Sequence, residues 1–150
     1  GGAFMEALGG GEPEPIRVSA INDPQRATLL TSFEAAHTDF ALIERVERAL
    51  GRGPDAPRRR LDSQDKHSML AAGMGDIYLR LSPDPNFVEK LWDHAAGYAI
   101  VTEAGGYVTD VDGSPLDFSS GSRMLKNRGV LMTNGHLHQA VLDAIAASKG

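Results

Sequence analysis

Segments with the two-residue hydrophobic period of a β-strand alternate along this chain with segments that have the helical period. Residues 76–81 show the strand period, because Ile77 and Leu79 fall on one face and Tyr78 and Arg80 on the other. Strands that alternate with helices build layered domains, so the pattern places the chain in the α/β class and leaves the strand order open. The length of 150 residues corresponds to about one domain with a core of its own.

The same periodicities predict where the elements lie. Strands are expected at residues 16–21, 60–62, 76–81, 107–110 and 129–132. Helices are expected after Asp23, from 39 to 50, from 64 to 72, from 93 to 104 and after Asn134. Asp23, Asp93 and Asn134 stand where N-cap residues are expected, and Gly51 and Gly105 follow the end of a helix.

Composition excludes several classes of protein. The chain has 15 Lys and Arg against 20 Asp and Glu, a formal net charge of −5, so it lacks the basic surface of a general nucleic-acid-binding protein. A nucleotide held by a few local cations is compatible with that charge. Without cysteine there is no disulfide, thiolate zinc site or cysteine nucleophile. No apolar run approaches the roughly 20 residues of a membrane span and no signal peptide is recognisable, so we expect no membrane association and a cytoplasmic or organelle-matrix location.

Asp93 is the first candidate for chemistry. A carboxylate at a helix N-terminus faces the positive end of the helix dipole, and such a hard oxygen ligand suits Mg²⁺. The residues alone favour a simpler interpretation, in which Asp93 only caps its helix. His94 has no partners at ligand spacing, so we expect it to be packed or solvated rather than a metal ligand. We also assign Trp92 and Phe118 to packing and interpret the run 58–60 as solvated.

Four motifs follow one another closely in the second half of the chain. They are WDHAAG at 92–97, IVTEAGG at 100–106, VTDVDGSPLDF at 108–118 and RGVLMTNG at 128–135. In this order they resemble the C-terminal half of the lithium-sensitive, Mg²⁺-dependent phosphatases, a superfamily of inositol monophosphatases, fructose-1,6-bisphosphatases and 3′(2′),5′-bisphosphate nucleotidases. Two upstream segments, LDSQDKHSMLAAGMGDIYLRL at 61–81 and SFEAAHTD at 32–39, are similar to the nucleotidase branch.

This resemblance implies a fold and an activity. The fold is a layered αβα domain with a mixed central sheet, in which residues 1–150 form a single α/β domain matching the C-terminal half of the family. The activity is Mg²⁺-dependent hydrolysis of the 3′-phosphate of 3′-phosphoadenosine 5′-phosphate (PAP) to AMP and phosphate, inhibited by Li⁺ and Na⁺. The Glu-Glu pair and DPIDGT-type segment of the family's metal cage have no counterpart here. We therefore expect an inactive isolated chain whose partner is the missing N-terminal half.

The resemblance also implies roles for individual residues. Asp93 corresponds to a metal-binding aspartate of the family. His37, Ser63, Lys66 and Arg80 correspond to positions that contact the substrate, a small nucleotide. No residue of the chain is assigned to catalysis itself.

Each substrate-contacting assignment has a structural alternative. His37 could cap the helix that begins near Asp39, and Ser63 could be an N-cap beside a solvated Lys66. Arg80 could be a surface arginine on an edge strand. Two other functions also stay open, namely an inositol-phosphate phosphatase of the same superfamily and a non-catalytic nucleotide-binding domain.

Overall fold

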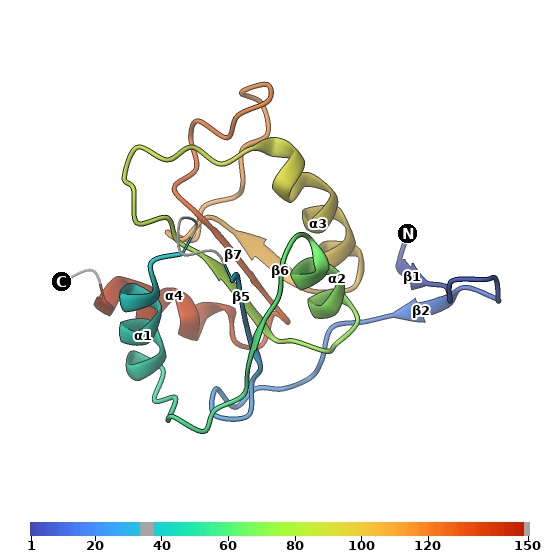
Figure 1. Cartoon of the computed structure of the whole chain (residues 1–150), viewed down its shortest axis with the longest axis horizontal. Coiled ribbons are helices and arrows are strands. Elements are labelled where there is room, and N and C mark those ends of the chain that lie inside the picture. Colours follow the sequence, from blue (N-terminus) through green and yellow to red (C-terminus); the bar gives the residue numbers. More distant parts are fainter. Residues whose placement is uncertain (34–37, 149–150) are drawn as a thin grey trace.

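The computed structural model of the chain describes residues 1–33 and 38–148 (Figure 1). Its strands are β1 (Ala3–Met5), β2 (Glu14–Ile16), β3 (Leu29–Thr31), β4 (Arg58–Arg60), β5 (Ile77–Arg80), β6 (Tyr107–Thr109) and β7 (Val130–Thr133). Its helices are α1 (Phe40–Ala49), α2 (Asp65–Ala71), α3 (Leu91–Glu103) and α4 (His138–Ser148). Within the described part of the chain, no helix has the length and apolar character needed to cross a bilayer.

The central sheet is mixed and has helices on both faces. Its strand order is β4-β3-β5-β7-β6. Strand β3 runs parallel to β4 and β5, whereas β7 runs antiparallel to β5 and β6. Helices α2 and α3 pack together on one face, and α1 and α4 pack together on the other (Figure 1). The predicted layered αβα domain with a mixed sheet is therefore confirmed.

Strand β5 separates the two apolar cores of the domain. Ile77 and Leu79 belong to the core formed with α1 and α4, and Tyr78 belongs to the core formed with α2 and α3. This confirms the alternation predicted for residues 76–81. Because side chains alternate along a strand, Arg80 follows Tyr78 on the α2 and α3 side and lies at the end of the strand.

Helix α1 begins and ends where the sequence predicts. The Asp39 side chain accepts a hydrogen bond from the backbone N–H of Leu42 at 2.9 Å, which caps the first turn. Gly51 follows the helix with a φ of 72°, a left-handed conformation that favours glycine. Ile43 and Val46 are buried against the sheet. The predictions for helices α2 and α3 and for strands β6 and β7 are confirmed with small shifts at the ends, and β4 lies two residues before its predicted start.

The predicted strand at 16–21 is wrong apart from its first residue. Beyond β2, the backbone bonds to other elements rather than to a neighbouring strand. The N–H of Val18 donates to the carbonyl of Ala104 at 3.1 Å, and the carbonyl of Ile21 accepts from Nδ2 of Asn134 at 2.7 Å. Asn134 therefore does not cap the last helix as predicted, since its side chain is used to fix this segment and α4 begins further along the chain.

The helix predicted after Asp23 is also absent from the described structure, where residues 24–26 form a turn. The carboxylate of Asp23 accepts a hydrogen bond from the N–H of Gln25 at 2.9 Å, and its carbonyl accepts from the N–H groups of Arg26 and Ala27. This local bonding by an aspartate side chain competes with helix formation.

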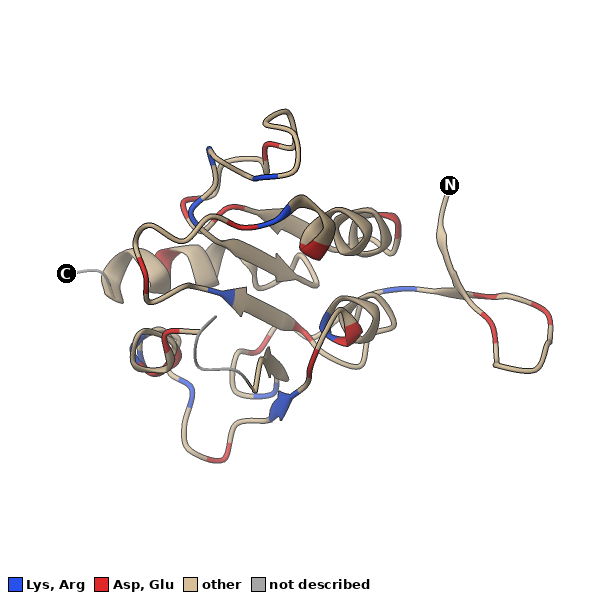
Figure 2. Cartoon of the chain, turned by 45° about the horizontal axis from the view of Figure 1, so that its top comes forward, with Lys and Arg blue, Asp and Glu red and all other residues tan. Residues whose placement is uncertain are grey.

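Strands β1 and β2 form a hairpin whose tip projects from the domain (Figure 2), while Ala3 at its base is buried in the core formed with α2 and α3. Short strands without alternation gave no sequence signal for it. Phe4, Met5 and Leu8 are 60%, 48% and 107% exposed there, respectively. The hairpin therefore has unpaired strand edges and uncovered apolar side chains. A two-stranded hairpin of this kind is only marginally stable in water by itself.

Candidate functional site

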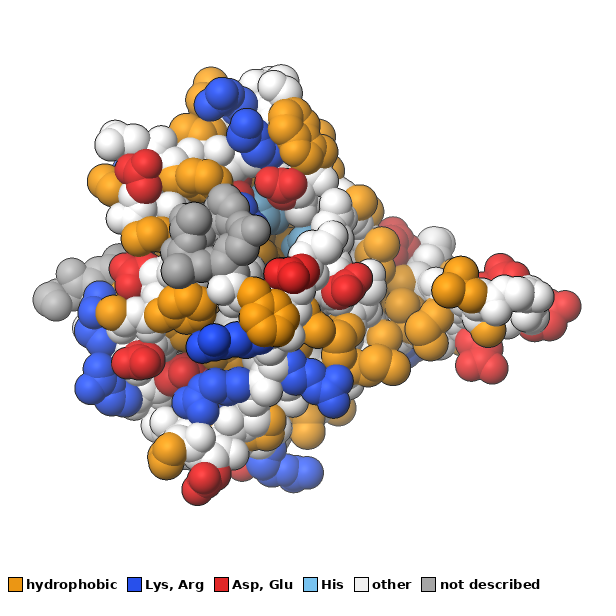
Figure 3. Space-filling model, viewed as in Figure 1, with side chains coloured by type: hydrophobic (Ala, Val, Ile, Leu, Met, Phe, Trp, Pro, Cys, Tyr) orange, Lys and Arg blue, Asp and Glu red, His pale blue; other side chains and the backbone are white. Residues whose placement is uncertain are grey.

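Four of the five site residues predicted from the sequence line one cavity. They surround a cavity of about 390 Å³. Ser63 lies just before α2 and Lys66 in its first turn, while Arg80 ends β5 and Asp93 lies in the first turn of α3. Figure 3 shows histidine atoms recessed in this face, with acidic groups around them. His37, the fifth predicted residue, lies outside the described residues.

Asp93 lies in the first turn of α3 but does not cap it. The helix begins at Leu91, with the extended residue Lys90 in the N-cap position, so the predicted capping role of Asp93 is wrong. Asp93 lines the cavity instead. Its carboxylate has no hydrogen bond or ion pair to another residue of the described ranges. The positive end of the helix dipole favours a negative charge at this position.

Arg80 is held by a buried carboxylate. Its Nε donates to Oε1 of Glu89 at 2.8 Å, and the second carboxylate oxygen lies 2.8 Å from Nε2 of His94. The Arg80 side chain is 12% exposed, so the alternative of a surface arginine is wrong. Burial by itself raises the pKa of Glu89, but the hydrogen bond and charge of His94, followed by those of Arg80, outweigh it and hold the pKa below its usual value.

Lys66 is buried and is fixed by backbone oxygens. Its Nζ donates to the carbonyls of Leu61 and Ser63, both at 2.9 Å, and the residue is 3% exposed, which excludes the solvated alternative. Ser63 has a φ of 53°, the only positive φ of a non-glycine residue in the described part. The N-cap of α2 is Gln64, so Ser63 does not cap that helix. The strained Ser63 backbone and the buried Lys66 ammonium thus form one local unit beside the cavity.

His67 also lines the cavity, although the sequence gave no reason to select it. Its ring is 2% exposed, and neither ring nitrogen has a hydrogen-bond partner among the residues described. Burial, together with the smaller effect of His94 and two basic side chains, lowers the pKa of His67 to about 3, so the ring is neutral. It meets the ring of Tyr78 edge to face at 5.1 Å. Burial raises the pKa of Tyr78 to about 12, which keeps the phenol neutral as well.

Lys90 also lines the cavity, and its side chain contacts Trp92, which does not line it. The Nζ of Lys90 lies 5.3 Å from the centre of the Trp92 ring, a cation–π contact. Trp92 is 56% exposed, so its assignment to packing is wrong, whereas Phe118 is packed against the ring of Tyr98 as predicted. Side chains at 58–60 are exposed as predicted (basic strand β4 in Figure 2), although Arg58 also pairs with Glu47 at 2.8 Å.

Two carboxylates, those of Asp62 and Asp93, line the cavity beside its basic groups. Across residues 1–33 and 38–148, no group of three or more His, Asp or Glu side chains is placed to hold a metal ion. Mg²⁺ often takes one or two protein carboxylates and completes its shell with waters and substrate phosphates. The donor set here fits one side of such a site.

The fold and the cavity define an α/β domain that can bind an anion beside a carboxylate suited to a divalent cation. A sequence profile of the inositol monophosphatase family matches residues 1–149. The chain belongs to this family.

The curated relatives are longer than this chain. It is 43% identical over 144 residues to a 3′(2′),5′-bisphosphate nucleotidase of Oryza sativa and 38% identical over 150 residues to one of Schizosaccharomyces pombe. These matches cover 96% and 97% of this chain but 39% and 41% of the relatives. The chain thus spans about two fifths of the length of the curated relatives it matches.

Solved structures confirm the fold. The IMPase of Thermotoga maritima matches with a TM-score of 0.66 at 27% identity, over 97% of this chain and 51% of that one. An inositol monophosphatase from Anabaena (Nostoc) sp. matches with a TM-score of 0.63 at 25% identity, over 96% of this chain and 54% of that one. The domain described here corresponds to about half of each of these proteins.

Proposed function

We propose that this chain is the substrate-binding part of a Mg²⁺-dependent phosphatase that hydrolyses the 3′-phosphate of PAP to AMP and phosphate. The observation that carries the proposal is the meeting of Ser63, Lys66, Arg80 and Asp93 around one cavity, although they come from three different elements. The nucleotidase names of the relatives support the nucleotide as substrate.

The basic groups of the cavity bind the phosphates of the substrate. Lys66 supplies a compact buried charge, and Arg80 supplies a planar guanidinium that can pair with two phosphate oxygens. The hydroxyl of Ser63 adds a hydrogen-bonding group on the exposed side. Asp93 is the residue of this chain that would hold one Mg²⁺. When bound, the metal supplies positive charge to the phosphoryl and leaving oxygens.

The remaining metal ligands would come from a second part of the enzyme, the N-terminal half that the resemblance implies. The projecting hairpin supports this division into two parts. Its free strand edges and the exposed side chains of Phe4, Met5 and Leu8 are suited to pairing with further strands. We propose that residues 1–150 act as one domain next to that half.

A second candidate is a phosphatase for inositol phosphates, because the matching solved structures are inositol monophosphatases at 25% and 27% identity. The higher identity to nucleotidases favours PAP. A non-catalytic nucleotide-binding domain is the third candidate. The three candidates differ in the substrate from which the completed protein releases phosphate, if it releases any.

The test is phosphate release by the isolated chain and by the chain fused to the portion of the Oryza sativa relative that it does not cover. We expect release from PAP by the fusion in Mg²⁺, inhibited by Li⁺, and almost none by the isolated chain. Preferential release from inositol 1,4-bisphosphate would instead establish the second candidate. A folded fusion with no release from either substrate would leave the chain as a binding domain.

A further inference from the structure

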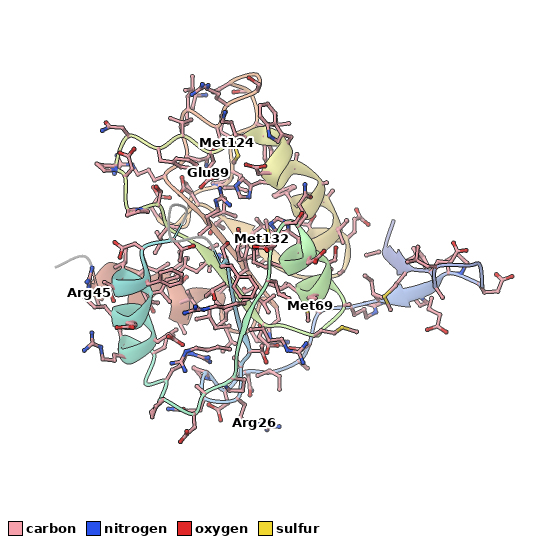
Figure 4. All side chains as sticks on the ribbon, viewed as in Figure 1. Arg26, Arg45, Met69, Glu89, Met124 and Met132 are labelled. Atoms are coloured by element: carbon pink, nitrogen blue, oxygen red, sulfur yellow. The ribbon has the colours of Figure 1, made fainter. Side chains whose placement is uncertain are left out.

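Glu89 is a buried carboxylate behind Arg80, which lines the cavity, and the proposed function gives it no part in binding. It is 2% exposed and lies just before α3 (Figure 4). Its backbone is fixed, because its carbonyl accepts from the N–H of Met124 at 2.9 Å and the next residue, Lys90, bridges to Arg123. Met124 itself is fully buried. The side chain of Glu89 therefore starts from a rigid point of the fold.

Both oxygens of this carboxylate are engaged. Oε1 accepts from Nε of Arg80, and Oε2 meets Nε2 of His94, each at 2.8 Å. His94 is fully buried, and its other ring nitrogen has no partner in the described ranges, so its only hydrogen bond there is to Glu89. The three side chains form a chain of contacts that ends in the guanidinium on the cavity wall. Because the guanidinium is planar, a hydrogen bond at Nε fixes its orientation.

The charge of Glu89 has the wrong sign for a site that binds phosphate. A carboxylate close to an anion site repels the ligand, so by charge alone its removal would strengthen binding. A carboxylate that holds the arginine in place has the opposite effect, because its loss leaves fewer contacts, among them those with Tyr78 and Phe87, to order the side chain. Part of that ordering must then be repeated at each binding event. The sign of the change in affinity therefore separates the two roles.

We propose that Glu89, supported by His94, is the positioning residue that holds Arg80 toward the substrate phosphate. This inference rests on the proposed function, because it takes Arg80 as a phosphate-binding group. Glu89 touches neither substrate nor metal and acts through Arg80 alone.

The test is a double-mutant cycle on the 150-residue chain, with PAP and inorganic phosphate as ligands in calorimetric titrations. We expect Arg80→Ala to weaken PAP binding by about ten- to a hundredfold, as the loss of a charged hydrogen bond does. Glu89→Ala should weaken it by a similar factor, and the double variant should be no weaker than Arg80→Ala. Glu103→Ala, at the exposed far end of α3, removes the same charge outside the cavity and should change little.

NMR spectroscopy can detect the hydrogen bond between Arg80 and Glu89 in the absence of ligand. The Nε–H proton resonance of Arg80 should be shifted downfield and protected from exchange in the wild-type chain, and both properties should disappear in Glu89→Ala. If that variant does not fold, Glu89→Asp replaces it in both experiments, because the shorter side chain keeps the charge but draws the carboxylate back. We expect the affinity of Glu89→Asp for PAP to fall about three- to tenfold, because the hydrogen bond to Arg80 is lost or weakened.

The outcomes are distinct. Tighter or unchanged binding after loss or shortening of Glu89, or losses that add in the double variant, would overturn the positioning role while Arg80→Ala still supports the proposed function. No effect of Arg80→Ala would remove Arg80 from the phosphate site and would end both assignments.

Discussion

The ring of His67 occupies the space that a side chain at position 97 would need. A Cβ atom built on Gly97 would lie 2.4 Å from Cγ and 2.6 Å from Nδ1 of His67. Gly97 is thus the point at which α3 approaches α2 beside the cavity. Steric exclusion explains the glycine of the WDHAAG motif, because the imidazole of His67 could not lie against the helix if position 97 carried a side chain.

Replacing this glycine should loosen the wall of the cavity. We expect Gly97→Ala to lower the free energy of unfolding by about 1–3 kcal/mol, as overpacking of a core does, measured by urea denaturation. In a His67→Ala background, the same Gly97→Ala change should lower the free energy of unfolding by less, because the ring that would clash with the new methyl group is absent. An alanine at 97 that leaves stability unchanged would contradict the close contact.

Stability should depend on pH through two buried histidines. Burial lowers the pKa of His67 to about 3 and that of His138 to about 4, against 6.5 for an exposed imidazole. As the pH falls through 6.5, the unfolded chain binds these protons and the folded chain does not. The stabilisation is therefore complete above pH 6.5 and is lost below it, by up to about 1.4 kcal/mol per pH unit for each ring.

This dependence can be measured by urea denaturation between pH 4.5 and 6.5, above the range in which Glu89 takes up its proton. His67→Phe removes one of the two groups and should flatten the slope, whereas His136→Gln, at an exposed position, should not. Equal slopes in wild type and His67→Phe would show that the ring takes up its proton with the same pKa in the folded and unfolded chains, which would contradict the effect of burial.

Helix α1 and strand β5 could be predicted because their signals are local. Asp39 and Gly51 mark the two ends of a periodic segment, and the alternation around Tyr78 spans a whole strand. Strand β3 and the hairpin could not be predicted, since their three-residue segments show no alternation of apolar and polar residues. The segment after Ile16 was misjudged because its alternation reflects contacts with distant elements.

The site residues also divide into those with a local sequence signal and those that depend on contacts between distant residues. The resemblance selected Lys66, Arg80 and Asp93, and the structure brings them to one cavity. Glu89 and His67 carry no pattern of their own, because their importance comes from contacts across the sequence, with Arg80 and Gly97. The capping role of Asp93 was wrong because α3 starts at Leu91, two residues before the position that the sequence predicts.

Asp93→Asn should separate a metal ligand from a structural residue. In the completed fusion we expect turnover to fall by about a hundredfold or more, which corresponds to several kcal/mol of metal-dependent stabilisation, with the fold unchanged. Asp65→Asn is the matched control, since Asp65 is also in the first turn of a helix but does not line the cavity. Near wild-type turnover in Asp93→Asn, measured by phosphate release at saturating Mg²⁺, would remove Asp93 from the metal site.

Arg80→Ala should alter the choice of substrate in the fusion. We expect KM for PAP to rise by about ten- to a hundredfold and KM for inositol 1,4-bisphosphate to rise less, because a guanidinium can contact the base as well as a phosphate. Arg128→Ala, an exposed arginine away from the cavity, serves as the control. Equal rises for both substrates would limit Arg80 to phosphate binding.

The most direct test of the central claim is a map of where PAP binds. Amide chemical shifts of the isotopically labelled 150-residue chain are recorded by NMR during titration with PAP. We expect saturable changes confined to the segments that line the cavity, namely Ser32, residues 62–67, Tyr78, Arg80, Phe87, Lys90 and Asp93. No saturable change, or changes centred on the groove between α1 and β4 that Phe40 and Arg60 line, would contradict the assignment of this cavity as the substrate site.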